Sequence, residues 1–403
     1  MIETTFSKSR FRWLQSPQAS AALAWLAEQT DPASLASAAR LRRQLDATQA
    51  AWVAELDQTR RRANAKLGPL APAIMASRTG LEQATRWSVA RWRADRLRHF
   101  GVATVIDAGC GIGIDALAML QAGFDLVGIE RDPDTADCAE ANWRQFGGDP
   151  DKWQLLRADL TSVDWQGWLH DPTCAIMLDP GRRGANGRSW KVADLSPSWD
   201  FVTGIIERAA GPVVVKLGPG FPMELIPDTV DACWLSDRGD LVECSLWAST
   251  LASGHRQAVL LDRSGNEFDL DVTSLPPAPG PLGTVIYEPD PSVIRSGAIG
   301  TLARLIDAHP VSRGIAYLTS DHYLPTPLAS AFAIKEQLDH RVKALRQWVH
   351  DQGIGILEIK LRGVDLDPAQ LRRQLKPTGR NSATLLLTPT IDHLQALWVE
   401  RLA

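Results

Sequence analysis

The stretch TVIDAGCGIG, residues Thr104–Gly113, decides the fold of this 403-residue chain. Its first four residues can form a buried parallel strand that ends in Asp107. Three glycines, Gly109, Gly111 and Gly113, then precede a helix. Glycines at such a turn adopt backbone angles that a side chain would forbid, and they let a ligand approach closely. The stretch therefore predicts a strand–loop–helix unit with a ligand site at its turn.

A carboxylate on the next strand indicates the kind of ligand. The strand FDLVGIE ends in Glu130, 17 residues after Gly113. An acid at the tip of a second strand can accept hydrogen bonds from both hydroxyls of a ribose, so an adenosyl group is expected. Two other interpretations compete. One is a plain strand–helix turn with a solvated Glu, and the other is a dinucleotide fold, because residues 111–116 also fit GxGxxA.

The pattern D-x-G-x-G-x-G, followed by Glu130, Asp159 and the Asp-Pro pair at 179–180, resembles the class I S-adenosylmethionine-dependent methyltransferases. The resemblance implies that the glycine loop lies under the methionine part of S-adenosylmethionine. It also implies that Glu130 holds the ribose and Asp159 the adenine amino group. The residues expected to contact this cofactor are Asp107, Gly109, Gly111, Gly113, Glu130, Arg131, Asp159, Leu160 and Glu82.

Composition predicts a soluble globular protein of two or three domains. The chain is 45% hydrophobic and 22% charged, has no run of 18 apolar residues, and starts without a signal-peptide core, so a cytoplasmic protein with no membrane segment is expected. Its five cysteines include no CxxC pair, which argues against a disulfide framework and a zinc ribbon. The histidines show no metal spacing, so no metal site is expected.

Charge is unevenly distributed along the chain. Residues 1–100 carry 16 Lys/Arg and 8 Asp/Glu, residues 101–250 carry 11 and 23, and residues 251–403 carry 16 and 16. A basic N-terminal arm is typical of a nucleic-acid partner. Arg60, Arg61, Arg62 and Lys66 are candidates for phosphate contacts, although the same residues also fit the solvated face of a long helix.

The first hundred residues are expected to be helical, with helices at 10–30, from 32 to about 66, and at 82–99. Gly68 is expected to end the second helix. Thr79 and Glu82 fit a capping box for the third helix. Alternatively, Glu82, Gln83 and Thr85 close the cofactor pocket, as polar residues upstream of the first strand often do in class I methyltransferases.

From 102 to 247 the sequence alternates strand and helix, as a doubly wound sheet requires. Helices are expected at 114–122, 133–146 and 198–210, and the strands around residues 237–240 are expected to form a hairpin that closes the sheet. This terminal antiparallel pair favours a methyltransferase over a dinucleotide fold. A second hairpin at 255–270, a proline-rich linker at 274–283 and a helix at 297–308 follow.

The last 74 residues have a βαβ-like rhythm that is expected to end in a helix at 391–402. With Gly363 and the PTGRN loop, a group of cations there fits either RNA phosphates or a plain surface: Lys360, Arg362, Arg372, Arg373, Lys376 and Arg380.

Beyond the cofactor core, the chain resembles a bacterial family of methyltransferases with a C-terminal THUMP-like domain. The resemblance rests on GLEQATR at 80–86, LDPGRR at 178–183, WLSDRGDLVECSLW at 234–247, YEPDPSVIRSG at 287–297 and IKLRGVDLDPAQLRRQL at 359–375. It implies an RNA substrate. The expected fold is therefore α/β, a Rossmann-like class I methyltransferase sheet with an N-terminal helical domain and a C-terminal α+β THUMP-like domain. The expected boundaries are 1–100 for the helical domain, 101–250 for the methyltransferase, 251–329 for a hairpin and linker region, and 330–403 for the THUMP-like domain.

The expected catalytic residues lie in DPGRR, where class I enzymes hold the acceptor. Asp179 can accept a hydrogen bond from an amine or a hydroxyl, and Arg182 suits a phosphate or a carboxylate, as do Arg183 and Arg188. Trp190 fits either stacking on an acceptor base or packing in a core. Cys244 is the one positional candidate for a uracil C5 nucleophile, but its alternating sequence favours a buried sheet residue.

The leading hypothesis is thus an S-adenosylmethionine-dependent RNA methyltransferase, active on tRNA or rRNA. The alternatives are a small-molecule or protein methyltransferase, and a non-catalytic RNA-binding protein that retains the cofactor pocket. The sequence does not indicate an oligomeric state.

Overall fold

The computed structural model describes residues 10–182 and 192–402. The chain divides into two compact units. The first comprises Met1–Asp231 with Ser245–Ser253, and the second Ala232–Cys244 with Gly254–Ala403. Each unit is described by itself below. The expected division into four domains stays a prediction.

The N-terminal helices are α2 (Pro17–Ala27), α3 (Leu35–Gln44) and α4 (Ala47–Leu67). The prediction of one helix from 32 to about 66 was wrong, because the chain is extended at Leu45 between α3 and α4. Asp46 restarts the helix: its carboxylate accepts from the Gln49 amide, and the Gln49 side chain accepts from the Asp46 amide, a capping box. Gly68, with φ of 51°, ends α4 as predicted.

Two short helices replace the single one expected at 82–99. They are α5 (Arg78–Gln83) and α6 (Trp87–Leu97). Ser77, not Thr79, is the N-cap of α5, and its hydroxyl accepts from the Gly80 amide. The expected Thr79–Glu82 capping box was therefore wrong, because Thr79 already lies inside the first turn of α5.

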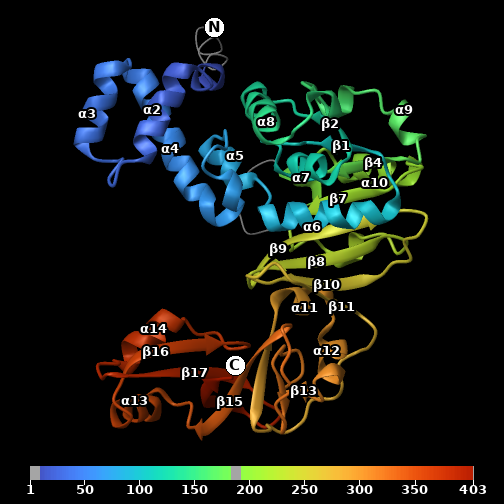
Figure 1. Ribbon diagram of the computed structural model, residues 1–403. Helices are drawn as coiled ribbons and strands as arrows, with labels where there is room; N and C mark the ends of the chain where they lie inside the picture. The colour runs from blue at the N-terminus through green and yellow to red at the C-terminus, as the bar shows by residue number, and fades with distance from the viewer. Residues whose placement is uncertain (1–9, 183–191, 403) are drawn as a thin grey trace. The chain divides into compact units, whose positions relative to one another are not determined.

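The first unit contains a parallel sheet with helices between its strands (Figure 1). Val105, Ile106 and Ala108 of β1 are fully buried, as expected of a central strand with neighbours on both sides. The helices expected at 114–122 and 133–146 are confirmed. The elements are β1 (Thr104–Ala108), α7 (Ile114–Ala122), β2 (Asp125–Ile129), α8 (Pro133–Phe146), β3 (Trp153–Leu156), α9 (Gln166–Leu169), β4 (Cys174–Leu178), α10 (Trp199–Arg208) and β7 (Val213–Leu217).

Shorter elements connect these strands and helices. Two two-residue strands, β5 (Gly181–Arg182) and β6 (Leu195–Ser196), pair with each other. The 3₁₀ helices are η1 (Gly68–Leu70), η2 (Arg98–Phe100), η3 (Pro150–Lys152), η4 (Leu160–Ser162), η5 (Val192–Asp194) and η6 (Met223–Leu225).

The nine-stranded sheet runs in the order β11-β10-β8-β9-β7-β4-β1-β2-β3. Strands β8 (Asp231–Asp237) and β9 (Asp240–Ala248) form at the expected hairpin. They do not close the sheet, because β10 (Arg256–Leu261) pairs parallel with β8. Strand β11 (Glu267–Asp271) then pairs antiparallel with β10, which makes the expected second hairpin an extension of the same sheet.

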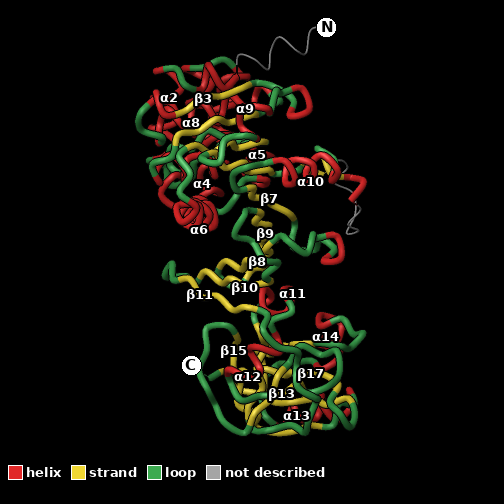
Figure 2. The backbone as a smooth tube through the Cα atoms, turned by 90° about the vertical axis from the view of Figure 1, so that its right-hand side faces the viewer, coloured by secondary structure: helices red, strands yellow, loops and turns green. Residues whose placement is uncertain are grey.

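The second unit has a sheet of its own, in the order β13-β14-β12-β15-β18-β17-β16. Its strands are drawn in yellow in Figure 2, and α13 and α14 in red. The elements are β12 (Val285–Pro289), α11 (Pro291–Ser296), α12 (Ile299–Leu305), β13 (His309–Pro310), β14 (Leu318–Ser320), β15 (Ala329–Leu338), α13 (Val342–Asp351), β16 (Ile354–Leu361), α14 (Pro368–Leu375), β17 (Asn381–Pro389) and β18 (Leu394–Arg401).

The helix expected at 391–402 was wrong: β18 is a strand between β15 and β17. Ala396 packs into the core cluster that includes Leu345 of α13, and Leu397 packs into a cluster with Phe332 on the other face of the sheet. A strand buried on both faces carries a continuous apolar run, and periodicity alone does not distinguish such a run from a buried helix.

Candidate active site

The glycine loop joins β1 to α7 and has the geometry that its sequence predicts. Gly109, Gly111 and Gly113 all have positive φ, at 91°, 56° and 81°. The Gly109 and Cys110 amides donate to the Ile129 carbonyl at the end of β2. Residues with side chains rarely adopt these angles, so the three glycines let the backbone turn tightly at the carboxyl end of the sheet.

Gly113 is also required by packing. A Cβ added there would lie 2.2 Å from Nε1 of Trp143, and one added at Gly128 would lie 2.2 Å from the other end of the same ring. Trp143 is fully buried and donates from Nε1 to the Gly113 carbonyl at 3.1 Å. The indole of α8 thus fills the space that the two glycines leave and fixes the end of the loop.

Asn142, the neighbour of Trp143, ties the loop to the N-terminal segment. It is 1% exposed. Its Oδ1 accepts from the Met75 amide at 2.7 Å, and its Nδ2 donates to the carbonyls of Met75 and Ile112 at 3.0 and 2.9 Å. Sequence reasoning missed this residue, and the available signal was an amide on the apolar face of α8.

Glu130 lies where the sequence places it, beside the glycine loop. Its Oε2 accepts from the Gly111 amide at 3.1 Å, and its Oε1 accepts from the Asp132 amide at 2.8 Å. Each carboxylate oxygen keeps a second lone pair. The two backbone amides therefore fix the orientation of the carboxylate and leave acceptor positions for a pair of hydroxyls.

Asp159 follows β3 and caps η4. Its carboxylate accepts from the Thr161 amide and hydroxyl at 3.0 and 2.6 Å, and these bonds, with Arg131 nearby, lower its pKa. Arg131 Nη1 lies 3.4 Å from Asp159 Oδ2. Leu160 opens η4, and its carbonyl accepts from Trp165 Nε1. The loops that follow β2 and β3 thus bring together Arg131 and Asp159, two of the side chains expected to contact the cofactor.

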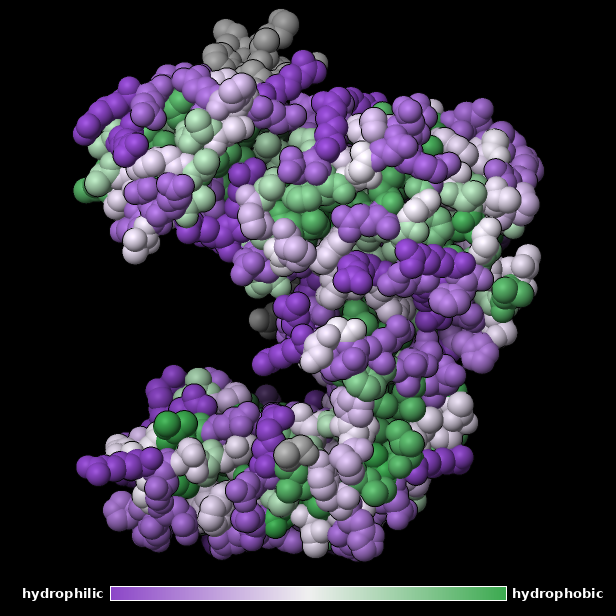
Figure 3. Space-filling view, viewed as in Figure 1, coloured by the Kyte–Doolittle hydropathy of each residue, from purple (hydrophilic) through white to green (hydrophobic). Residues whose placement is uncertain are grey.

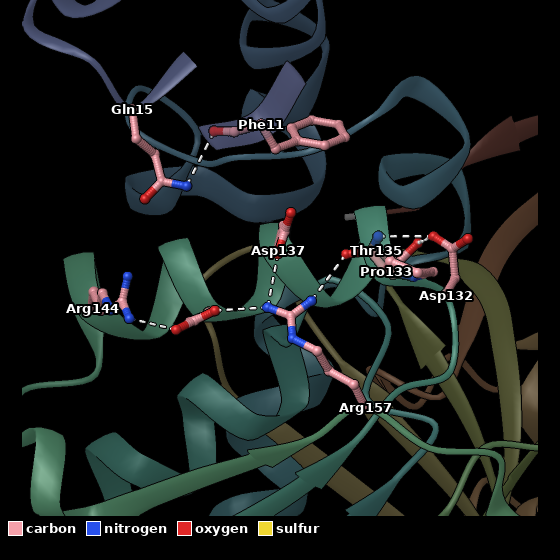
Figure 4. Close-up of polar contacts among 9 residues, drawn as sticks. Phe11, Gln15, Asp132, Pro133, Thr135, Asp137, Arg144 and Arg157 are labelled. Atoms are coloured by element: carbon pink, nitrogen blue, oxygen red, sulfur yellow. Dashed lines mark hydrogen bonds and ion pairs between the residues drawn. The ribbon is translucent and has the colours of Figure 1, made fainter. Parts of the chain in front are cut away.

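Arg157 anchors that loop to α8 (Figure 4). Its Nη2 pairs with Asp137 and Glu140, both at 2.7 Å, and its Nη1 donates to the Pro133 carbonyl at 3.2 Å. The guanidinium fork suits such multiple acceptors. Because Arg157 lies two residues before Asp159, these bonds limit where the Asp159 carboxylate can lie.

A set of charged side chains, called here the charged cluster, occupies the carboxyl ends of β1, β4 and β7. It consists of Arg93, Asp107, Asp115, Asp179 and Lys216. Lys216 Nζ, on β7, lies 2.9 Å from Asp115 Oδ2 and 2.5 Å from Asp179 Oδ2. Arg93, which is fully buried in α6, pairs with the other oxygen of Asp115. The cluster therefore connects α6 and α7 to the carboxylate that follows β4.

Thr85 adds a neutral donor to the charged cluster, because its hydroxyl donates to Asp115. Sequence reasoning proposed Thr85 as a pocket residue but missed Lys216 and Asp115. The signal for Lys216 was a lysine inside the apolar strand VVVKL, since a buried ammonium requires an acidic partner.

Electrostatics differ sharply between the acids of the charged cluster. Burial, and then the charge of Asp115, raise the pKa of Asp107 well above its usual value. Burial also opposes ionisation of Asp115, but Arg93 and Lys216 outweigh it and lower the pKa of that group to about 2. Asp107 Oδ2 is buried and has no hydrogen-bond partner within residues 10–182 and 192–402.

This imbalance fits a positively charged ligand. With all groups ionised, the charged cluster holds three carboxylates against two cations, and the carboxylate without a partner is Asp107, at the start of the glycine loop. A buried acceptor without a partner carries a desolvation cost that a ligand cation would remove. S-adenosylmethionine carries an ammonium and a sulfonium, so the residues present fit it.

The two expected catalytic residues differ in what the structure describes. The Asp179 side chain is 39% exposed, and Lys216 holds one of its oxygens. For Arg182 the structure describes the backbone in β5, but not the side chain. Arg183, Arg188 and Trp190 lie outside the described residues. Asp179 is thus the one expected catalytic side chain that the structure brings to the charged cluster.

Cys244 is fully buried, and burial raises its pKa, so it lacks the thiolate that a nucleophile needs.

Within the described ranges, no group of three or more His, Cys, Asp or Glu side chains could hold a metal ion. In the same part of the chain no helix is long and apolar enough to cross a bilayer. On the face drawn in Figure 3, hydrophobic residues form patches among hydrophilic ones. The cytoplasmic localisation stays a prediction.

The basic residues near the end of α4 mostly bind backbone rather than solvent. Arg60 donates to the Ala73 and Ile74 carbonyls, and Arg61 pairs with Asp57 and donates to the Leu26 carbonyl. Their interactions are those of structural residues. Phosphate contacts by these arginines stay a prediction, and the geometry favours Arg62, which is exposed.

Lys66 and Glu82 meet at α5. Lys66 Nζ donates to the Leu81 and Glu82 carbonyls at 2.8 and 2.7 Å, where it satisfies the end of the helix. Burial, with Arg86 and Lys216 nearby, lowers its pKa to about 8. The Glu82 carboxylate pairs with Arg78 and is 62% exposed. Its expected contact with the cofactor stays a prediction.

The parallel sheet carries a glycine loop after β1 and an acid, Glu130, after β2. It also holds the buried carboxylate of Asp107 near the end of β1, which suits a ligand cation. Together these features define a nucleoside-binding methyltransferase fold. The comparisons identify the family. Two S-adenosylmethionine-dependent methyltransferases of Mycobacterium tuberculosis, from strains CDC 1551/Oshkosh and ATCC 25618/H37Rv and both described as uncharacterized, are 33% identical over 356 residues. The match covers 84% of this chain and 92% of theirs. The chain therefore belongs to the family of S-adenosylmethionine-dependent methyltransferases, and its cofactor is S-adenosylmethionine.

Residues 329–401 match the THUMP domain-like family. A crystal structure of a candidate methyltransferase from Porphyromonas gingivalis W83 covers 99% of this chain and 98% of its own, with a TM-score of 0.75 and 20% identity. At that identity the likeness shows the fold alone. The predicted α/β methyltransferase fold, the C-terminal THUMP-like domain and the enzyme class are confirmed.

Proposed function

We propose that this methyltransferase acts on RNA and that Asp179 positions the acceptor. Support for the substrate class comes from residues 329–401, because THUMP-type modules accompany RNA-modifying enzymes. Support for the residue comes from the position of Asp179 after β4, where class I enzymes hold the acceptor. The observation that carries the proposal is the ion pair that holds Asp179 beside the glycine loop.

Asp179 adjoins the glycine loop through its backbone. A Cβ on Gly109 would lie 3.4 Å from the Asp179 carbonyl oxygen, and the Asp179 amide donates to the Ala108 carbonyl. Its carboxylate is partly exposed, and Lys216 binds Oδ2. An acceptor that approaches the loop from solvent would therefore meet the Asp179 carboxylate.

When bound, S-adenosylmethionine supplies an electrophilic methyl group on a sulfonium sulfur. The task of the chain is to hold a nucleophile in line with that methyl group and to manage its proton. Asp179 accepts a hydrogen bond from the amine or hydroxyl of the acceptor, which orients a lone pair toward the glycine loop. Lys216 keeps the carboxylate in that orientation.

For the cofactor we propose the contacts that the resemblance to class I methyltransferases implies. Asp107 would offer its buried oxygen to the ammonium, Glu130 would accept from the ribose hydroxyls, and Asp159 would accept from the adenine amino group. Arg131, Leu160 and the glycine loop would contribute the remaining contacts. Glu82 would contribute a further carboxylate, which pairs with Arg78 in this structure.

Transfer of radiolabelled methyl groups tests the proposal. We expect the purified chain to label an RNA fraction taken from cells that lack it, and Asp179→Asn to label it about 10²–10⁴-fold more slowly. Asp200→Asn, at an exposed position in the first turn of α10, is the matched control and keeps full activity. RNA mass spectrometry with and without the protein then identifies the modified nucleoside. Label in protein or small molecules but in no RNA fraction contradicts the RNA assignment.

A further inference from the structure

Six cations of the second unit share an unusual environment. They are exposed, and none of their side chains has an ion pair or hydrogen bond with a residue in the described part of the chain. We call them the six-cation face: Lys343, Arg346, Arg372, Arg373, Lys376 and Arg380. Two come from α13, two from α14, and two from the segment that follows α14.

The cations of α13 lie opposite its buried stripe. Leu345, Trp348 and Val349 pack onto the sheet, whereas Lys343 and Arg346, three residues apart, lie on the outer side of the helix. In α14, Leu371 and Leu375 are buried in the same cluster. The two helices pack against each other, so their outer sides form one surface.

The loop 377–380 adds Arg380 to this surface from a fixed position. The Gly379 amide donates to the Ile354 carbonyl, and Asn381 donates from its amide to Gly353 and from Nδ2 to Gln352. A Cβ on Gly379 would lie 1.8 Å from the Gly353 carbonyl oxygen. The loop is therefore bound tightly to the turn between α13 and β16, and Arg380 starts from an anchored backbone.

Other cations of the same module are neutralised. Lys335 pairs with Glu400 at 2.8 Å and Arg341 with Asp339. Lys360, expected from the sequence to join the RNA-binding group, is 18% exposed and lies 2.7 Å from Glu288. Arg362, expected in the same group, lies over the Tyr317 ring. Within the described chain, the six-cation face thus lacks the acidic or aromatic partners that these residues have.

We propose that the six-cation face binds the phosphate backbone of RNA. The occupant follows from charge complementarity: exposed guanidinium and ammonium groups on two packed helices and an anchored loop suit a polyanion such as an RNA backbone. Four of the six are arginines, which bind phosphate oxygens in pairs. The inference rests on the proposed RNA substrate, and it assigns the contact with that substrate to a surface outside the active site.

Salt-dependent binding tests the assignment on the full chain, without cofactor. The probe is a fluorescein-labelled 20-base-pair RNA duplex, titrated between 50 and 250 mM salt. The variant is Arg346→Gln, Arg372→Gln and Arg373→Gln combined. Each lost phosphate contact removes about 0.9 from the slope of log affinity against log salt, so we expect the slope to shrink by about 2–3 and the affinity at 100 mM salt to fall at least about tenfold.

The matched control removes three cations of the same module that have partners, Lys335→Gln, Arg341→Gln and Arg401→Gln, and changes the net charge equally. We expect its slope to stay within about 1 of the wild-type value. Equal losses of RNA affinity in both triple variants would show a net-charge effect and overturn the assignment. Polyglutamate that competes as well as the unlabelled RNA duplex would overturn it too.

The outcomes separate this inference from the proposed function. If the Arg346/Arg372/Arg373 variant binds the duplex as tightly as wild type, the six-cation face does not bind RNA. The proposed RNA substrate then stands, with other residues making the contact. Loss of binding in that variant while no RNA is methylated supports the face and contradicts the proposed function. No wild-type binding at 50 mM salt overturns both.

Discussion

Charged side chains serve opposite purposes in the charged cluster and in the six-cation face. In the charged cluster, the side chains of Arg93, Asp115 and Lys216 are at most 11% exposed, and both cations bind Asp115. In the six-cation face every side chain is exposed and has no acidic partner in the described part of the chain. Buried pairs are strong and barely screened by salt, whereas exposed charges are weak and salt-sensitive. The first arrangement holds a geometry, and the second is available to a polyanion.

The largest expected effect comes from removing the lysine that joins two carboxylates of the charged cluster. Lys216→Met releases Asp179, and displacement of a positioning group by about 1 Å can cost about 10²-fold in rate. We expect kcat for methyl transfer to fall at least that much with KM for S-adenosylmethionine little changed, and Lys216→Arg to recover part of the loss. Steady-state kinetics with both variants measure kcat and the KM for S-adenosylmethionine separately.

Because Lys216→Met also breaks a buried pair, its folding needs a separate check. Circular dichroism and calorimetric cofactor binding should show a folded protein that binds S-adenosylmethionine within about threefold of wild type. A folded Lys216→Met protein with wild-type kcat would mean that Lys216 only stabilises the fold.

The next effect concerns the buried oxygen without a partner. Asp107→Asn removes a carboxylate whose ionised form burial opposes, so the free energy of unfolding at neutral pH should rise. The same change removes a charged acceptor for the ammonium, and we expect the affinity for S-adenosylmethionine to fall about 10–100-fold. Calorimetry measures the affinity for S-adenosylmethionine, and urea unfolding measures the free energy of unfolding. In wild type the affinity should increase with pH as Asp107 ionises.

Asp125→Asn is the control for Asp107→Asn, because Asp125 is an exposed acid on β2. It should leave the affinity for S-adenosylmethionine unchanged and change the free energy of unfolding little, because it breaks only an exposed ion pair with Lys152. Unaltered cofactor affinity in Asp107→Asn would place the ammonium elsewhere.

A smaller effect is the pH dependence of stability. The pKa of Asp115 is lowered from 3.8 to about 2 in the folded chain. Its contribution is therefore fully present above about pH 4 and is lost as pH falls toward 2, by about 2 kcal/mol. Urea unfolding between pH 2 and 5 should show this slope in wild type and a flatter one in Asp115→Asn. Identical slopes would show that Arg93 and Lys216 do not favour the ionised form.

The smallest effect is expected at the six-cation face. The combined Arg346→Gln, Arg372→Gln and Arg373→Gln variant should change the free energy of unfolding by less than about 1 kcal/mol, partly through the lost charge–dipole interaction at the end of α14. Urea unfolding measures it. A loss of several kcal/mol would mean that these arginines support the fold, which would erase the contrast with the charged cluster.

The glycine loop and its acids were predictable because their chemistry is local. Gly109 to Gly113 stand where a turn needs positive φ, and Glu130 follows the next strand at the expected spacing. The break between α3 and α4 was predictable too, since Asp46 and Gln49 form a capping-box sequence, but the apolar spacing on both sides concealed it.

The charged cluster and β18 depend on contacts between distant residues. Lys216 meets Asp115 across 101 positions in the chain, and no local pattern states which acid a buried lysine will bind. Residues 394–401 have apolar side chains at both helical and alternating spacings. Only their position between two strands, with Ala396 and Leu397 in different core clusters, makes them a strand.

The central position of β18 has a consequence for biosynthesis. Strands β15 and β17 have no partner for one edge each until the ribosome has added residues up to Arg401. Roughly 60 residues separate the end of β15 from that point, a delay of about 3–12 s at common elongation rates. During that delay the free edge of β15 stays open to wrong pairing, and the edge of β17 joins it once residues up to Pro389 have been added, so chaperones that bind unpaired strands would protect the nascent module.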